Sequence, residues 1–500
     1  MHQPRRPLRS FGGSVSGTGS GFASTQAAPS TRGGGRGSYY GRGRGRGRGM
    51  SNNGRTGLDR MESPAPPKGQ LMDTIPRRKL EEEGDKAEGE ARITDQQFVA
   101  SFNWLDTTMP AIAVPGAPPK YDPPKIPRQL QEDSGEFFRD KNAARCPNHP
   151  MEPTVRAVIL QNSSFDPAEI DIFACGSTFG NLLRFVRQED RTFRFVVEKV
   201  GRAFFFLRRE NTPNEMIPDV RGYGHSFPEA YNSWHEDLKG SSSAQRMIAY
   251  TFCGRRYIIR SESDGYLPEK LGGDGPTNVS IDLASPVVSA ADALSIQNAG
   301  TIIPQSAIFD LKTRSIRRRN EDHLEEQLGR LWANRTPNFV IAFHDRGLFT
   351  DIRKQDVQAK VDQWEREHTT ELRMLGRLVE RIVKCCAASS NGRCEVLSGE
   401  IGELQLREVG GQFPRALPQE LKSMWTQADP STSSSLYDAD AEADAQKGVE
   451  AQDDEESDGE RFGEEDCGKG AEEDGWSSDE ELDYTACSAE DCGYCGHCRY

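Results

Sequence analysis

Two short stretches of the chain place acidic and basic side chains at the spacing of a β-strand face. In IIRSESDGYL, Glu262 and Asp264 stand two residues apart, and in AIFDLKT the same spacing separates Asp310 from Lys312. Residues i and i+2 of a strand point to the same face, so two such strands lying side by side would bring three carboxylates and one ammonium together. Such a cluster is unfavourable unless a positive charge sits within it. Mg²⁺ or Mn²⁺, which favour oxygen ligands, would supply that charge.

A divalent metal held by these carboxylates would support the hydrolysis of a phosphodiester. The metal would polarise the phosphate and lower the pKa of a bound water, while Lys312 would orient that water or stabilise developing charge. The same spacing also occurs on solvated strand faces that bind nothing. The residue types therefore indicate a metal-dependent phosphodiesterase, and the solvated face stays open as the alternative.

The sequence pattern around these residues predicts one α+β domain over residues 93–426, with a mixed central β-sheet and flanking helices. The elements of this domain would position the four side chains. Alternating apolar residues predict two hairpins, one turning at Gly201 and the other at Cys253–Gly254. TVRAVILQ (154–161) has the composition of a further strand. The apolar stripe over 353–384 predicts one long helix whose stripe packs into the core.

The two ends of the chain differ from this middle in composition and charge. Residues 1–60 carry eleven Arg and one Asp, whereas residues 429–500 carry 24 acidic and four basic side chains. The whole chain has 49 Gly and 29 Pro and is only 35% hydrophobic, so much of it cannot bury apolar surface. We therefore expect a disordered RG-rich arm over 1–92 and a disordered acidic tail over 427–500.

The tract RGGGRGSYYGRGRGRGRG is typical of an arm that binds RNA or protein. Its guanidinium groups can pair with phosphate or stack on a base, although a solubilising arm is the alternative. Further arginines directly follow Lys312, where they could hold an RNA backbone or form a solvated helix start. The candidate RNA-binding residues are Arg42, Arg44, Arg46, Arg48, Arg314, Arg317 and Arg318.

The closing CSAEDCGYCGHC could bind Zn²⁺ tetrahedrally or form a flexible thiol-rich end. Its four cysteines are Cys487, Cys492, Cys495 and Cys498. The other cysteines are scattered in apolar contexts, which suits free thiols in a reducing compartment. We expect no secretory signal, because residues 1–20 lack an apolar h-region. We expect no membrane span, because no apolar run approaches roughly 18 residues.

Three stretches in this order, IIRSESDGYL, AIFDLKTRS and TPNFVIAFHDRGLF, resemble the PD-(D/E)XK nuclease pattern. More narrowly they resemble the eukaryotic decapping and 5′-end RNA quality-control nuclease family, whose members include the partner of the nuclear 5′ exoribonuclease. The resemblance implies that Glu262, Asp264 and Asp310 bind Mg²⁺ or Mn²⁺ and that Lys312 is the catalytic lysine. It implies a nuclear, or alternatively cytoplasmic, enzyme that processes RNA 5′ ends. Its implied partners are RNA and a 5′ exoribonuclease, or basic proteins that bind the acidic tail.

Two departures from that family pattern weaken the implied site. The family has Glu where this chain has Asp310, and a Gly-x-x-Phe-Glu element upstream. RGYGHSFPEAY resembles that element, but Pro228 directly follows Phe227, so Glu229, the implied further metal ligand, is displaced by one residue. A catalytically inactive nuclease fold that binds RNA is therefore the alternative function.

The whole chain, from SFNWLD to CSAEDCGYCGHCRY, also resembles filamentous-fungal proteins that often carry the label geranylgeranyl pyrophosphate synthetase. Such a synthase needs two Asp-rich motifs on facing helices of an all-α fold. The candidate here is DDEESD (453–458), which has no second copy and lies in an acidic run. The residues therefore disfavour that activity.

Overall fold

The structure is a computed structural model that describes residues 63–82, 89–189, 191–217, 220–273, 275–284 and 294–427. The chain divides into two units, Met1–Met61 and Glu62–Tyr500, and every described residue belongs to the second. The arginines of the RG tract and the four C-terminal cysteines lie outside the described residues. No helix of the described residues has the length and apolar character needed to cross a bilayer.

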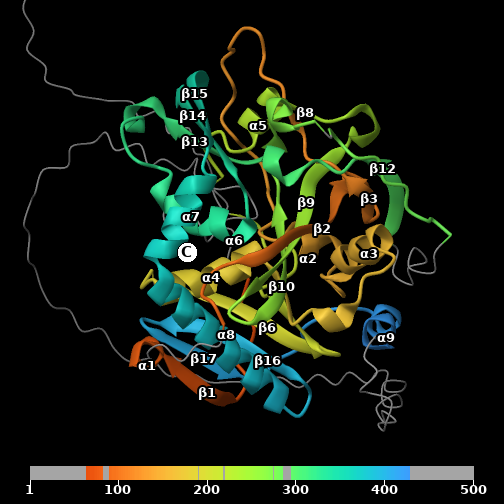
Figure 1. Cartoon of the computed structure of the whole chain (residues 1–500), viewed down its shortest axis with the longest axis vertical. Coiled ribbons are helices and arrows are strands. Elements are labelled where there is room, and N and C mark those ends of the chain that lie inside the picture. Colours follow the sequence, from red (N-terminus) through yellow and green to blue (C-terminus); the bar gives the residue numbers. More distant parts are fainter. Residues whose placement is uncertain are drawn as a thin grey trace, which may run out of the picture. The chain divides into compact units, whose positions relative to one another are not determined.

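The fold is α+β, as expected, and its larger sheet has eleven strands within the described residues (Figure 1). It is a mixed sheet, because β5 runs parallel to both β10 and β7 while most other neighbours are antiparallel. In spatial order its strands are β1 (Leu71–Pro76), β17 (Glu403–Arg407), β16 (Arg393–Glu400), β6 (Phe193–Val200), β7 (Ala203–Arg208), β5 (Ile172–Cys175), β10 (Arg255–Glu262), β9 (Ser241–Phe252), β2 (Thr94–Leu105), β3 (Ala111–Gly116) and β12 (Ser295–Gly300).

A second sheet of six strands carries the other candidate residues. It is also mixed, with β13 parallel to β14 and β14 antiparallel to β15. Its order is β15 (Leu348–Asp356), β14 (Asn338–Asp345), β13 (Ile308–Ser315), β11 (Gly265–Tyr266), β4 (Lys120–Tyr121) and β8 (Asn232–Ser233).

Helices cover both faces of the larger sheet, and strand alternation decides which residues each group of helices contacts. On β10, Tyr257 and Ile259 join the core with α4, α6, α7 and α8, whereas Ile258 joins the core with α3 and α9 (Figure 1). The helices are α1 (Arg77–Glu82), α2 (Lys141–Arg145), α3 (Glu152–Gln161), α4 (Gly176–Val186), α5 (Ser226–Tyr231), α6 (Leu328–Asn334), α7 (Gln358–Glu367), α8 (Thr369–Ala388) and α9 (Gln419–Gln427).

Both predicted hairpins are present, and two other local predictions are wrong. Cys253 and Gly254 have φ of 45° and 73°, as the tight turn between β9 and β10 requires. TVRAVILQ is helix α3, not a strand; Pro153 lies in its first turn, and Val155 and Val158 pack into the core three residues apart. The long helix predicted over 353–384 begins as strand β15 and is then divided into α7 and α8 at His368.

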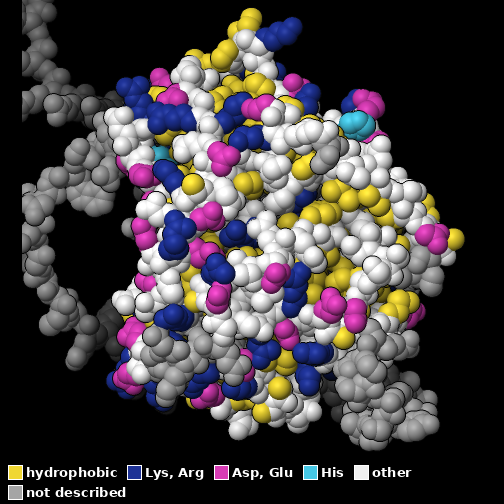
Figure 2. Space-filling view, in the orientation of Figure 1, with side chains coloured by type: hydrophobic (Ala, Val, Ile, Leu, Met, Phe, Trp, Pro, Cys, Tyr) yellow, Lys and Arg dark blue, Asp and Glu magenta, His cyan; other side chains and the backbone are white. Residues whose placement is uncertain are grey.

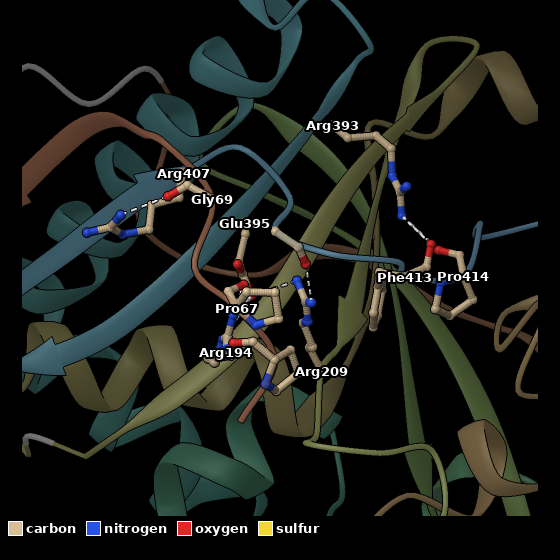
Figure 3. A network of polar contacts seen from close by, with 11 residues as sticks. Pro67, Gly69, Arg194, Arg209, Arg393, Glu395, Arg407, Phe413 and Pro414 are labelled. Atoms are coloured by element: carbon tan, nitrogen blue, oxygen red, sulfur yellow. Dashed lines mark hydrogen bonds and ion pairs between the residues drawn. The ribbon is translucent and has the colours of Figure 1, made fainter. Parts of the chain in front are cut away.

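The folded part also begins earlier than predicted, because β1 and α1 lie in the segment expected to be disordered. β1 pairs antiparallel with β17 at an edge of the larger sheet. Arginines from the sheet hold the residues before β1 through their carbonyl oxygens (Figure 3): Arg194 Nη1 donates to Pro66 O at 2.8 Å, and Arg407 Nη1 to Gly69 O at 2.8 Å. Low local hydrophobicity hid this segment, which is held by backbone pairing and by the burial of Ile75 and Leu80 in the core.

Candidate active site

The carboxylates of IIRSESDGYL lie where the chain passes from the larger sheet to the smaller one. Glu262 is the last residue of β10, Asp264 follows the end of that strand, and Gly265 begins β11. β10 pairs with β5 and β9, while β11 pairs antiparallel with β13, where Gly265 lies opposite Phe309. The two strands expected to be neighbours are therefore joined through the short β11, and the candidate residues lie at the junction of two sheets.

Glu262, Asp264 and Asp310 line one small cavity at this junction. Its volume is about 30 Å³, which is room for roughly two water molecules. Residues of β5, α4, β7, β9, β10, β13, α6 and α2 meet there, so the cavity depends on the complete fold. The lining residues are Arg139, Asp140, Asn142, Cys175, Gly176, Ser177, Arg208, Gln245, Arg260, Ser261, Glu262, Asp264, Asp310, Arg330 and Asn334.

Crowding of negative charge is strongest at Asp264. Burial, together with the neighbouring Asp310 carboxylate, raises the pKa of Asp264 from 3.8 to about 7. The charges of Lys312 and Arg330 and the backbone N–H of Leu311, which donates to Asp264 Oδ2 at 2.6 Å, offset part of this rise. The cavity therefore favours a proton or a cation at Asp264 near neutral pH.

Basic side chains already balance the other two carboxylates. Arg330 of α6 donates to Asp310 through Nη2, and both side chains are buried. Lys141 Nζ of α2 lies 3.6 Å from Glu262 Oε1. The positive charge that the sequence assigned to a metal is thus supplied, in this structure, by two side chains from helices.

Arg260 differs from these bases because it has no partner among the described residues. It lies two residues before Glu262 on β10, so both side chains point to the same face. Its side chain lines the cavity and is only 8% exposed, and its buried Nη1 has no hydrogen-bond partner within the described chain. A guanidinium buried in this way is costly unless an anion completes its hydrogen bonds.

Lys312 and Glu229 do not line the cavity. Lys312 is 5% exposed and lies on the same face of β13 as Asp310, close enough for its charge to lower the pKa of Asp264. Glu229 is exposed on α5, because the buried Phe227 and Tyr231, four residues apart, turn the opposite side of that helix toward the core. The structure therefore does not bring Glu229 to the other carboxylates.

The predicted basic patch after Lys312 is not a continuous surface. Arg314 is 1% exposed and lies 4.0 Å from Glu326, so it faces the interior. Arg318 is paired with Glu321 at 2.6 Å, whereas Arg317 is exposed. Lys and Arg side chains are interspersed with carboxylates over the face seen in Figure 2. An RNA contact on this face would therefore depend on particular cavities and not on one broad basic stripe.

The oxygen donors in the cavity have the chemistry of a Mg²⁺ or Mn²⁺ site, but they do not form a closed one. Within the described residues, no three His, Cys, Asp or Glu side chains are grouped so that they could hold a metal ion. Proteins commonly hold Mg²⁺ with one or two carboxylates and leave its other positions to water and substrate phosphate. The residues present therefore fit a metal that enters with a phosphorylated ligand.

Comparison with known proteins places most of the folded chain in one family. Residues 89–424 match a family described as "Domain of unknown function (DUF8563)". No curated protein matches the chain.

Several solved structures resemble the chain at low identity. Scheffersomyces stipitis Rai1 in complex with (3′-NADP)⁺ and calcium ion is 12% identical, with a TM-score of 0.47 over 71% of this chain and 100% of that chain. Candida albicans Rai1 in complex with pU5-Mn²⁺ is 11% identical, with a TM-score of 0.39 over 74% of this chain and 99% of that chain. K. lactis Dxo1 in complex with manganese is 8% identical, with a TM-score of 0.39 over 70% of this chain and 97% of that chain.

Proposed function

The chain belongs to the family described as "Domain of unknown function (DUF8563)", and we propose that it acts on the phosphorylated 5′ ends of RNA as a divalent-metal-dependent hydrolase. The observation that carries the proposal is the cavity at the junction of the two sheets. There, three carboxylates and the unpartnered Arg260 face the same space. Oxygen donors beside a buried guanidinium suit a phosphate that arrives with a hard cation.

Within this proposal each group has a distinct task. Arg260 binds a phosphate oxygen and completes its own hydrogen bonds by doing so. One or two of the carboxylates of Glu262, Asp264 and Asp310 would hold Mg²⁺ or Mn²⁺, and the bound metal would polarise the phosphate and lower the pKa of a bound water. Lys312 is buried on β13, two residues after Asp310. Its positive charge lowers the pKa of Asp264 and so favours the ionised carboxylate.

A second candidate function is the recognition of RNA 5′ ends without cleavage. The Arg330–Asp310 ion pair and the outward position of Glu229 favour it, because both reduce the number of carboxylates available to a metal. Prenyl-diphosphate synthesis is disfavoured, since that chemistry needs an all-α fold and this fold has two large sheets. DDEESD lies outside the described residues.

Incubation of the full chain with 5′-triphosphorylated RNA and Mg²⁺ or Mn²⁺ tests the proposal. We expect metal-dependent release of the 5′ end, resolved by gel electrophoresis and lost in Asp264→Asn. Binding without cleavage, weakened in Arg260→Met, would support the second candidate instead. A chain that neither binds nor cleaves this RNA in the presence of metal would refute both.

A further inference from the structure

A second cavity lies outside the carboxylate site, against β14 and β15. Its volume of about 430 Å³ falls in the range typical of small-ligand sites. Phe339, Ile341 and Phe343 of β14 form its buried floor. The remaining lining residues are Arg319, Asn320, Glu321, Asp322, His323, Leu324, Arg353, Gln355 and Lys360.

This second cavity opens on the same face of the smaller sheet as the carboxylate cavity. Asp310 of β13 lies opposite Phe339 of β14, which in turn lies opposite Gln355 of β15. Paired residues on adjacent strands share a face, and two strand spacings are about 10 Å. The two cavities thus lie about two strand spacings apart, and the face that they share also carries the buried core formed with α6 and α7.

His323 lines the second cavity and carries a buried acceptor that has no partner within the described residues. Its side chain is 3% exposed, and Nε2 lies 2.8 Å from the carbonyl oxygen of Arg318. In the neutral ring Nε2 carries the hydrogen donated to that carbonyl, which leaves Nδ1 as an acceptor. Nδ1 is buried and has no hydrogen-bond partner among the described residues. A ligand with a hydroxyl or amino hydrogen would satisfy it.

Cations line the rim of the second cavity, and its carboxylates are already engaged. Glu321 is paired with Arg318, and Asp322 Oδ1 accepts from the backbone N–H of Leu324 at 3.0 Å. Arg319 and Lys360 are exposed, and no ion pair engages either side chain within the described chain.

Arg353 lines the second cavity, but its charge is already paired with a carboxylate. Its Nη2 lies 2.6 Å from Asp351 Oδ2, and its guanidinium carbon lies 4.7 Å from the centre of the Phe343 ring. Its Nη1 also donates to the carbonyl oxygen of Arg319 at 3.3 Å, which ties the 319–324 loop to β15. The charge available to a ligand is therefore that of Lys360 and that of Arg319, which also acts on the Asp351 carboxylate.

We propose that this cavity binds one nucleotide of an RNA chain. Arg319 and Lys360 hold its phosphate, and a ribose hydroxyl or base amino group donates to His323 Nδ1. Phosphate and hydrogen-bond donor occur together in a nucleotide, and a cavity of this volume can enclose one. The inference rests on the proposed function only for the choice of RNA as the polymer.

Fluorescence anisotropy with a labelled, 5′-phosphorylated decauridylate tests this inference on the full chain, with chelator present so that nothing is cleaved. We expect the double variant Arg319→Ala/Lys360→Ala to weaken binding at least about tenfold. It should also reduce the slope of log Kd against log salt by about 0.7, because one phosphate contact is lost. His323→Phe should weaken binding with little change of slope. Lys384→Ala, an exposed lysine on α8 outside the cavity, is the matched control and should bind as wild type does.

An unchanged Kd and salt slope in the double variant would overturn the inference. Uridine monophosphate binding as tightly as the decamer would overturn it in favour of a free nucleotide. Arg319 and Lys360, the two residues replaced in the double variant, do not line the carboxylate cavity. A wild-type chain that does not hydrolyse RNA would therefore refute the proposed hydrolase activity. A weaker Kd in the double variant would still support nucleotide binding at the second cavity.

Discussion

Replacing Arg260 by Met should stabilise the folded chain and weaken RNA binding at the same time. Arg260 is 8% exposed, and its buried Nη1 lacks a hydrogen-bond partner within the described residues. An unsatisfied buried polar group costs about 1–3 kcal/mol, so Met, of similar shape, should raise the free energy of unfolding by up to that amount. A charge-assisted hydrogen bond to phosphate contributes about 1.5–3 kcal/mol, so RNA affinity should fall roughly 10- to 100-fold.

Urea unfolding and anisotropy with 5′-phosphorylated RNA, both with chelator, measure the two effects. Arg246→Met is the matched control, because Arg246 on the adjacent β9 is equally buried but donates to Gln305 Oε1 at 2.5 Å and to Ile303 O at 2.7 Å. Its replacement should destabilise the chain and leave RNA affinity unchanged. If Arg260→Met instead lost stability and kept its RNA affinity, the arginine would be structural and the reasoning refuted.

Three further predictions concern charges. Burial and Asp310 raise the pKa of Asp264 from 3.8 to about 7. The native state thus retains a proton that the unfolded state loses, and the free energy of unfolding falls as pH rises through that window. Asp264→Asn should flatten this decline in urea unfolding with chelator at pH 5 and 8; an equal decline would contradict it. Glu395 is 0% exposed and pairs with both Arg194 and Arg209 (Figure 3), so Glu395→Gln should cost about 3–5 kcal/mol in urea unfolding, and a loss below about 1 kcal/mol would contradict that. Arg330→Gln should tighten Mn²⁺ binding in calorimetry by removing the cation that competes for Asp310; weaker or unchanged binding would count against the metal site.

Short-range rules predicted the parts of the site that depend on one strand at a time. Turn chemistry predicted the hairpin that pairs β9 with β10, the strand that ends at Glu262. The period-two alternation of a strand also places Arg260 on the same face of β10 as Glu262. The spacing rule failed in detail at Asp264, because β10 ends at Glu262 and the chain changes sheets there.

The rest of the site could not be predicted from local patterns. Arg330 lies on α6 and Lys141 on α2, far from β10 in sequence, and nothing in their neighbourhoods marks them as partners of Asp310 and Glu262. Tertiary packing also reversed the β-propensity of Val155 and Val158, which are buried on α3. The spacing of residues in the sequence predicts which carboxylates a site contains. Only the fold shows which basic side chains pair with those carboxylates.

The basic side chains that pair with the carboxylates determine how a metal can bind. Their presence predicts that metal and phosphate bind cooperatively. A metal entering alone must compete with Arg330 for Asp310 and with Lys141 for Glu262. It must also displace the proton favoured at Asp264 near neutral pH. A phosphate entering with the metal supplies oxygen ligands and gives the displaced guanidinium, together with Arg260, an anion to pair with.

Coupling between two ligands is reciprocal, so Mn²⁺ should bind at least about fivefold more tightly when uridine monophosphate is present, and the nucleotide should tighten by the same factor with Mn²⁺. Calorimetry in both orders of addition measures the two factors, and Arg260→Met should bring both toward one. Uridine monophosphate could also bind at the second cavity, so the titration is repeated in Arg319→Ala/Lys360→Ala. The coupling between Mn²⁺ and the nucleotide should persist in that variant. Equal Mn²⁺ affinity with and without nucleotide would mean that Arg330 and Lys141 permanently replace the metal. Recognition without cleavage would then be the function that the cavity supports.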